Sequence, residues 1–184
     1  SYFTVLKHCP VFLDDKEVLP GTETPVNHLH PDQEWYTTDV FTDYALHFMD
    51  ESFKQHAEQP LFLYLAYNAP HFPLHARAED TKKYRGRFRD VGWDKLRQER
   101  YERMVKLGLI KKEWALSPLD VPKWETYDAK LRDELDLKMA LYSAIIDRMD
   151  QNIGRVVQQL KSACRLDNPL TMLLVDNGVP RTVL

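Results

Sequence analysis

The 184-residue sequence has little cysteine and no long apolar run. Its two cysteines, Cys9 and Cys164, are far apart along the chain and could pair only if the fold brings them together. We expect two buried free thiols, so the cysteines identify no redox compartment. The apolar runs are much shorter than a membrane-spanning helix, and no N-x-S/T acceptor for glycosylation occurs.

An excess of basic residues is also missing. The chain has 25 Lys and Arg against 28 Asp and Glu, a formal net charge of −3, and no dense basic block. This balance argues against nucleic-acid binding and against attachment to a membrane surface. The hydrophobic fraction of 43% and the charged fraction of 29% are typical of one globular domain with a core.

The two ends indicate a piece of a longer protein. The chain begins at Ser1 without a methionine or a signal-peptide pattern, and it ends in "VPRTVL" soon after an apolar segment. We expect sequence to be missing at both ends.

Turn formers and helical patterns divide the chain. Proline and other turn formers in residues 1–35 predict a loop-rich entry with short extended pieces. Apolar residues at helical spacing predict helices over residues 36–56, 92–110 and 127–163. The strongly charged residues 79–90 predict a surface helix with a turn at Gly86. Thr37 or Thr38 is a candidate N-cap, and Gly108 suits the C-terminal end of the third helix.

Two continuous apolar runs have the length of a β-strand. They are "LFLYLAY" at residues 61–67 and "LTMLLVD" at residues 170–176. Such runs indicate strands that are covered on both faces, as in a parallel sheet. With helices between them, they predict an α/β domain with helices packed on a sheet.

A histidine follows the first apolar run, in the order Asn68-Ala-Pro70-His71-Phe-Pro73-Leu-His75. The two prolines restrict the backbone on both sides of His71, so its imidazole can be held at low entropic cost. Because histidine titrates near neutral pH, His71 can bind an oxyanion or donate a proton to a leaving group. These residues equally allow a histidine packed in a proline-rich loop. The prolines argue against a zinc site shared with His75.

The second apolar run ends in Asp176-Asn177-Gly178. Carboxylate and amide oxygens are ligands that calcium and magnesium favour, and α/β sheets bind ligands at the carboxyl ends of strands. Gly178 allows the strand to end, so that both side chains can face one ion. Taken alone, the motif is more simply a turn, and two ligands do not make a calcium site.

Other polar and aromatic residues have simpler interpretations. Asp39 and Asp43 suit the start of a helix, and Asp147 and Asp150 suit the polar face of a packed helix. Three tryptophans are expected to be packing anchors rather than a sugar-binding platform: Trp93, Trp114 and Trp124.

Taken in order, several of these motifs resemble the sulfatase family. The segments are "YTTDVFTDYALHFM", "FLYLAYNAPHFPLHA", "GWDKLRQERYERMVKLGLI", "LSP", "MALYSAIIDRMDQNIGRVVQQL" and "LLVDNG". Together they are similar to the middle of an arylsulfatase, from about Trp35 to Gly178. The resemblance rests on the order and spacing of separate motifs rather than on one of them.

The resemblance implies an alkaline-phosphatase-like fold, a three-layer α/β/α sandwich that is incomplete here. It implies hydrolysis of aryl or carbohydrate sulfate esters by a formylglycine nucleophile and a divalent metal, usually Ca²⁺. By the same resemblance, His71 binds the sulfate and helps protonate the leaving oxygen, and Asp176 and Asn177 are metal ligands. A proton donor and a divalent cation suit this reaction because charge develops on the departing oxygen.

Parts of the family pattern are absent from these residues. The C/S-x-P-x-R motif that supplies formylglycine does not occur, and "CPVF" at Cys9 does not match it. The remaining aspartate ligands and the lysine after D-N-G are also absent. We therefore expect the 184-residue chain alone to have no turnover and to bind calcium weakly.

The expected organisation is one partial catalytic domain over residues 1–184. It consists of an entry at 1–35, a family-like core at 36–178 and a divergent tail at 179–184. The alternatives are a non-catalytic remnant and a phosphodiesterase or phosphonate hydrolase of the same superfamily. The resemblance implies a periplasmic, secreted or lysosomal protein, whereas the residues themselves leave the compartment unknown.

Overall fold

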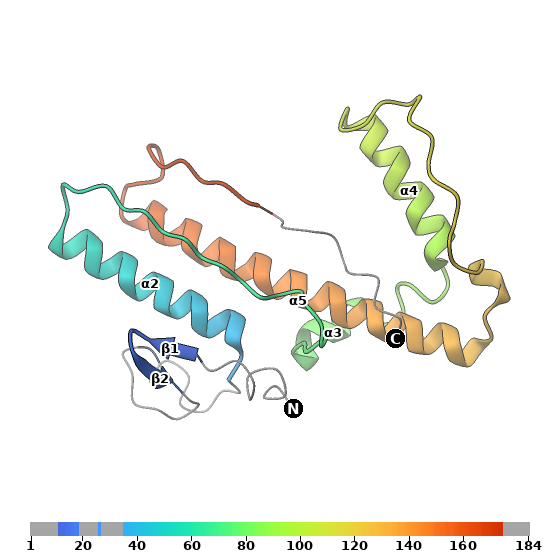
Figure 1. The fold of residues 1–184 in the computed structure, drawn as a ribbon, viewed down its shortest axis with the longest axis horizontal. Helices are drawn as coiled ribbons and strands as arrows, with labels where there is room; N and C mark the ends of the chain where they lie inside the picture. The colour runs from blue at the N-terminus through green and yellow to red at the C-terminus, as the bar shows by residue number, and fades with distance from the viewer. Residues whose placement is uncertain (1–10, 19–25, 27–34, 175–184) are drawn as a thin grey trace. The chain divides into compact units, whose positions relative to one another are not determined.

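The structure is a computed structural model and describes residues 11–18, 26 and 35–174. These residues are mostly helical, with one small sheet (Figure 1). The elements are β1 (Val11–Leu13), β2 (Lys16–Val18), α2 (Thr37–Gln55), α3 (Ala78–Tyr84), α4 (Gly92–Lys106), the 3₁₀ helix η2 (Trp124–Thr126) and α5 (Ala129–Ser162). The chain divides into two units, one comprising Ser1–His75 with Ile146–Leu184 and the other Ala76–Ile145. Helix α5 contributes residues to both.

A short hairpin and helix α2 form the core of the first unit. Strands β1 and β2 pair antiparallel, with Val11 opposite Val18. These strands are the short extended pieces predicted for the entry segment. A cluster of buried apolar side chains connects the hairpin to α2. It consists of Val26 with Val40 and Tyr44 of α2, and Leu13 and Trp35 pack against it.

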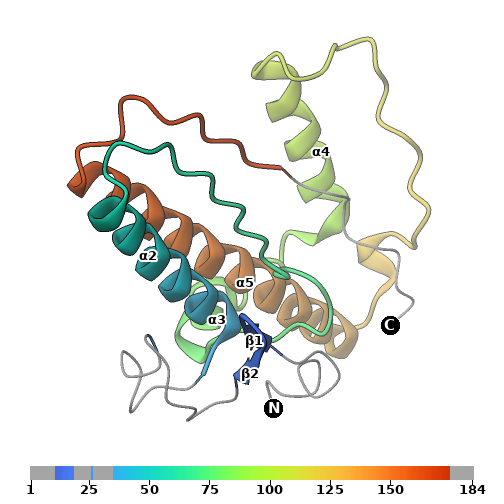
Figure 2. The same cartoon turned by 60° about the vertical axis from the view of Figure 1, so that its left-hand side comes forward.

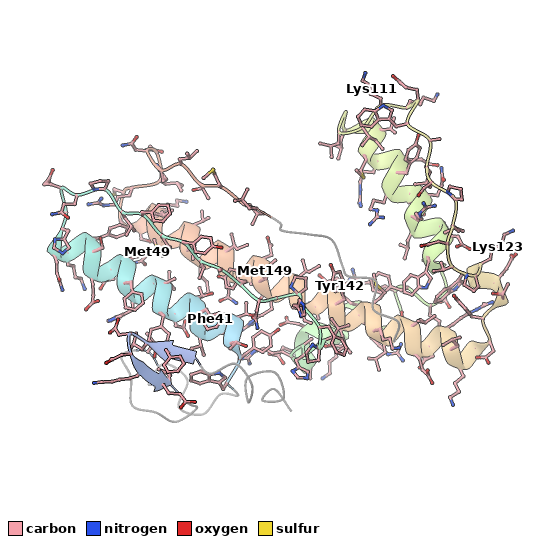
Figure 3. All side chains as sticks on the ribbon, in the orientation of Figure 1. Phe41, Met49, Lys111, Lys123, Tyr142 and Met149 are labelled. Atoms are coloured by element: carbon pink, nitrogen blue, oxygen red, sulfur yellow. The ribbon has the colours of Figure 1, made fainter. Side chains whose placement is uncertain are left out.

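Helix α2 lies beside the C-terminal part of α5 within the first unit (Figures 1 and 2). The side chain of Met49, labelled in Figure 3, is 1% exposed and is among the most buried on α2. The other buried residues of α2 are apolar at Val40, Tyr44 and Ala45 but polar at Thr38, Asp39, Thr42 and Asp43, so the helix has a buried face of mixed polarity.

The two predicted strands are absent from the described residues. Neither residues 61–67 nor the described part of the second run, residues 170–174, has strand structure. They are not buried either: Phe62 is 89% exposed and Leu170 is 85% exposed. A strand needs a neighbour for its backbone hydrogen bonds, and no described segment pairs with either run. The prediction of buried strands was therefore wrong for this chain by itself.

The helix predictions are confirmed by α2, α3, α4 and α5, which agree with the predicted ranges within a few residues. The predicted N-cap of α2 is wrong. Tyr36 is the N-cap residue, and it makes no side-chain capping hydrogen bond. Gly108 follows the end of α4 with a φ of +71°, and its amide donates to the carbonyl of Val105. This is the left-handed ending that the glycine predicts.

Cys164 lies just beyond the end of α5. It is a free thiol, and it is exposed rather than buried, so the prediction of two buried thiols was wrong for this residue. Its φ of +53° and the hydrogen bond from its amide to the carbonyl of Lys161 turn the chain out of the helix. Cys9 is outside the described residues.

Trp124 is the packing anchor of the second unit. Its ring meets Trp93 edge-on at a centroid distance of 4.8 Å, and it is 7% exposed. Gly92 has a φ of +77°, and a Cβ there would lie 2.3 Å from Cγ of Trp124, so only glycine fits. The predicted role as a packing anchor is confirmed for Trp93 and Trp124, but it is wrong for Trp114, which is exposed.

Asp136 of α5 organises the turn between α3 and α4. Its fully buried carboxylate accepts hydrogen bonds from the backbone amides of Gly86, Phe88 and Arg89 and pairs with the guanidinium of Arg85. Burial alone would raise the pKa of Asp136, but these hydrogen bonds outweigh it and hold the pKa below its ordinary value of 3.8.

Replacing Asp136 by asparagine is expected to lower the free energy of unfolding by about 2–3 kcal/mol at neutral pH, because charged hydrogen bonds to buried amides are lost. Since the folded-state pKa is depressed, this contribution is fully present above the unfolded pKa and disappears as pH falls through the folded pKa. Urea unfolding at several pH values measures it. Asp133→Asn, which removes a half-exposed partner of the same arginine, is the control. A destabilisation by Asp136→Asn that stays constant down to about pH 2 would contradict the assignment.

Candidate functional site

The segment after α2 turns back along that helix and carries His71. Tyr67 reaches Thr42, in the first half of α2, through a hydrogen bond of 2.7 Å between their hydroxyl oxygens. Farther along, the hydroxyl of Tyr36 at the start of α2 donates to the carbonyl of His75 at 3.0 Å. Residues 68–75, called the His71 loop below, therefore lie near the N-terminal half of α2.

The exposed fraction of the side chains alternates along residues 61–64. Phe62 and Tyr64 are 89% and 80% exposed, whereas Leu61 and Leu63 are 37% exposed each. Tyr67 has the same parity as Leu61 and Leu63, and its hydroxyl contacts α2. The segment thus has the side-chain geometry of a strand with one face on the helices, although no strand pairs with it.

His71 is exposed, and its ring is oriented by the backbone. Nδ1 lies 2.6 Å from the carbonyl oxygen of Phe72, and the amide of His71 donates to the carbonyl of Asn68 at 2.9 Å. A carbonyl only accepts hydrogen bonds, so Nδ1 carries a proton. Nε2 is then the ring atom left for a ligand. The bonds Ala69–Pro70 and Phe72–Pro73 are both cis.

His75 differs from His71 in its surroundings. It is partly buried, and burial lowers the pKa of His75 below its ordinary value. Among the described residues, no group of three or more His, Cys, Asp or Glu side chains is placed to hold a metal ion. The expectation that His71 and His75 form no zinc site stays a prediction.

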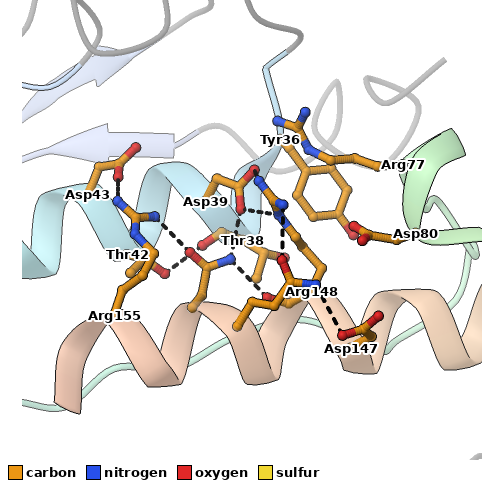
Figure 4. A network of polar contacts seen from close by, with 12 residues as sticks. Tyr36, Thr38, Asp39, Thr42, Asp43, Arg77, Asp80, Asp147, Arg148 and Arg155 are labelled. Atoms are coloured by element: carbon orange, nitrogen blue, oxygen red, sulfur yellow. Dashed lines mark hydrogen bonds and ion pairs between the residues drawn. The ribbon is translucent and has the colours of Figure 1, made fainter. Parts of the chain in front are cut away.

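A buried ion pair joins α2 to α5 (Figure 4). The guanidinium of Arg148 donates to both carboxylate oxygens of Asp39, at 2.7 and 2.8 Å, and Asp39 is 2% exposed. The amide of Asn152 donates to the same carboxylate at 2.7 Å. Such a bidentate pair fixes both the distance and the rotation of one helix against the other.

One turn farther along α2, Asp43 repeats the pattern. Its buried carboxylate pairs with Arg155, and Arg155 also donates to the side-chain carbonyl of Asn152 at 2.8 Å. The interpretation of Asp39 and Asp43 as simple helix-start residues was therefore incomplete, because both are buried and paired across the helices. Asp147 and Asp150 lie on α5, and Asp147 accepts a hydrogen bond from the side-chain amide of Gln151.

Sequence reasoning missed this network and the two tyrosines, Tyr36 and Tyr67. The signal for the network was available. Asp39 and Asp43 are four residues apart, and Arg148, Asn152 and Arg155 recur at the same helical spacing, so each set shares one face of its helix. The tyrosines gave no such signal, because their partners are 39 and 25 residues away in sequence.

Asp176 and Asn177 lie outside the described residues, so their assignment as metal ligands stays a prediction. Among the described helices, none is long and apolar enough to cross a membrane.

The sequence comparisons decide the family. A family model described as Sulfatase matches residues 14–182. The chain belongs to the sulfatase family. The matched region includes the whole segment, Trp35 to Gly178, on which the resemblance rests, so that resemblance is confirmed.

Two relatives of this sulfatase-family chain show the same relationship. A protein of Schizosaccharomyces pombe named as an uncharacterized sulfatase is 32% identical over 163 residues, which are 87% of this chain and 28% of the relative. An arylsulfatase of Klebsiella aerogenes is 35% identical over 122 residues, which are 66% of this chain and 26% of the relative. The chain spans about a quarter of the length of these curated relatives.

Family membership has a consequence for the fold. The sulfatase family implies an alkaline-phosphatase-like fold, and its members typically use a metal and formylglycine. A mostly helical structure with two apolar, strand-like segments that have no sheet partner is consistent with a fragment of such a fold.

Proposed function

We propose that the whole protein containing this chain hydrolyses aryl or carbohydrate sulfate esters, and that His71 binds the sulfate and protonates the leaving oxygen. The observation that carries this proposal is the orientation of an exposed imidazole. The backbone carbonyl of Phe72 engages Nδ1, and Nε2 remains for the substrate.

The tautomer suits a general acid. In the protonated imidazole, Nδ1–H donates to the carbonyl of Phe72, and Nε2–H is available to an oxygen of the ester. Transfer of the Nε2 proton to the leaving oxygen gives a neutral imidazole whose remaining proton is on Nδ1. That proton still satisfies the carbonyl, so the ring does not need to rotate during the step.

Asp176 and Asn177 are the proposed metal ligands of this chain. A carboxylate and an amide oxygen fit a hard cation such as Ca²⁺, and they account for only part of its usual six to eight oxygens. A bound divalent cation would neutralise charge on the sulfate. Formylglycine would come from a segment that is not among these 184 residues.

We propose further that the whole domain is a three-layer α/β/α sandwich. Residues 61–67 have an alternating exposure pattern with one face on the helices, and residues 170–174 are apolar and exposed. An apolar surface of this kind is typical of an interface with further protein. Helices α2 and α5 would form part of one helical layer, and both segments would be strands of the central sheet.

Activity against two ester classes tests the proposed chemistry. The whole protein, expressed with the maturation that forms formylglycine, is expected to hydrolyse 4-nitrophenyl sulfate with a higher kcat/KM than 4-nitrophenyl phosphate. The control is the same protein with His56→Gln, an exposed histidine at the end of α2. It should behave like the unaltered protein.

Two other outcomes have definite meanings. A higher kcat/KM for the phosphate ester, or for a phosphate diester, would favour the phosphodiesterase or phosphonate hydrolase alternative. Absence of turnover on all of these esters, in a protein shown by mass spectrometry to carry formylglycine, would favour the non-catalytic alternative.

A further inference from the structure

The His71 loop is attached to helix α2 at both of its ends by a tyrosine hydroxyl. Tyr67 immediately precedes the loop and bonds to Thr42, while Tyr36 bonds to the carbonyl of His75, the last residue of the loop. The oxygen–oxygen distances are 2.7 and 3.0 Å, which are ordinary hydrogen-bond lengths. The two attachments bracket His71 four residues away on either side.

The direction of the first hydrogen bond follows from Thr42. Its hydroxyl donates to the carbonyl of Thr38 at 2.8 Å, and a hydroxyl has only one proton. Tyr67 is therefore the donor and Thr42 the acceptor. Burial raises the pKa of Tyr67 above its ordinary value, which keeps this donor protonated at neutral pH.

The group at the α2 end of each hydrogen bond is buried. Thr42 is fully buried, and Tyr36 is 5% exposed. Helix α2 is held against α5 by the pairs Asp39–Arg148 and Asp43–Arg155. A displacement of either end of the loop would thus require breaking a hydrogen bond to an immobilised helix.

Inside the loop, the described contacts of His71 are local. Its amide bonds to Asn68, and its ring bonds to the carbonyl of the next residue, Phe72. These contacts set the orientation of the ring within the loop, but they do not fix the loop in the unit. The hydrogen bonds of the Tyr36 and Tyr67 hydroxyls connect the two ends of the loop to α2.

We propose that Tyr36 and Tyr67 are positioning residues that place His71 for reaction, through the two ends of its loop. The inference rests on the proposed function of His71. It assigns no contact with substrate to either tyrosine. Misplacement of a reacting group by about 1 Å can lower a rate by about 10²-fold, so hydroxyl groups remote from the ester can affect kcat.

The test removes each hydroxyl and keeps the ring. In the whole protein, Tyr67→Phe and Tyr36→Phe are each expected to lower kcat about tenfold, with a much smaller change in KM. Tyr44→Phe is the matched control. Tyr44 is also a buried tyrosine of this unit, on α2, and no described residue hydrogen-bonds its hydroxyl.

A spectroscopic measurement separates positioning from general loss of stability. In protein labelled with ¹³C and ¹⁵N histidine, the His71 signals are identified by their loss in His71→Gln. We expect the His71 chemical shifts of Tyr44→Phe to match those of the unaltered protein, and those of the two test variants to shift or broaden, because the loop that carries the ring is held less firmly. All spectra are recorded at a temperature where circular dichroism shows each variant to be folded.

The outcomes distinguish this inference from the proposed function. If Tyr36→Phe and Tyr67→Phe match Tyr44→Phe in both kcat and the His71 spectrum, the positioning role is wrong, whatever His71 does. If His71→Gln leaves kcat unchanged, the proposed function of His71 is wrong, and the spectra alone decide whether the tyrosines position the ring. If one variant does not fold, the other still gives both measurements.

Discussion

Replacing His71 by glutamine in the whole protein is expected to lower kcat for sulfate ester hydrolysis by about 10²–10⁴-fold. Glutamine is polar and of similar length, so it can still contact a sulfate, but it cannot transfer a proton to the leaving oxygen. The orientation of the ring supports a role in proton transfer. The backbone engages only Nδ1 of an exposed ring, which leaves Nε2 for the ester.

The dependence on the leaving group makes this prediction specific. A general acid matters less when the departing oxygen is already stable as an anion. The deficit of His71→Gln should therefore be smaller for 4-nitrophenyl sulfate than for phenyl sulfate, whose phenol is the weaker acid. The control variant His56→Gln should show no deficit with either ester. Equal deficits of His71→Gln with both esters would contradict proton donation and leave only a role in binding.

Replacing Arg148 by methionine is expected to lower the free energy of unfolding by about 3–5 kcal/mol. The change removes a bidentate guanidinium from the buried carboxylate of Asp39, while the hydrogen bond from Asn152 stays. Removing one partner of a buried ion pair is much more costly than the net contribution of the pair, because the other charge stays buried. Urea unfolding followed by circular dichroism measures the loss.

Two further variants give this measurement its controls. Arg100→Met removes an exposed arginine of α4 and should change stability by less than about 0.5 kcal/mol. The double variant Asp39→Leu with Arg148→Met removes both charges, and it should be more stable than Arg148→Met alone. If Arg148→Met costs no more than Arg100→Met, the ion pair contributes nothing measurable to the contact between α2 and α5.

The helices could be predicted from the sequence because their information is local. Apolar residues at helical spacing define α2 and α5, and Gly108 marks the end of α4. The N-cap of α2 could not be predicted in the same way. Thr37 and Thr38 both have the right chemistry, but Tyr36 takes the position and leaves both threonines inside the helix.

The two predicted strands could not be confirmed, because a strand depends on contacts that are not local. Residues 61–67 have the composition and the alternating exposure of a strand, and yet they have no strand structure in this chain. Strand structure depends on hydrogen bonds to a neighbour, which a sequence segment does not specify by itself. The apolar content of the run therefore predicted a strand, whereas the described residues supply no strand to pair with it.

The candidate site was predictable in part. The prolines around His71 pointed to an ordered histidine, and the carbonyl of Phe72 does orient its ring. The attachment of the loop to α2 was not predictable, because Tyr36 and Tyr67 contact residues distant in sequence. The burial of Asp39 and Asp43 was not predicted, because acidic residues are common near the start of a helix and usually need no partner there.

The most direct test of the central claim is a crystal structure of the whole protein with calcium and sulfate. We predict that Nε2 of His71 lies about 2.7–3.2 Å from an oxygen of one sulfate ion, and that Asp176 and Asn177 ligate the cation bound to the same sulfate. A sulfate and cation bound by Asp176 and Asn177, with the ring of His71 beyond hydrogen-bond reach of that sulfate, would contradict the account.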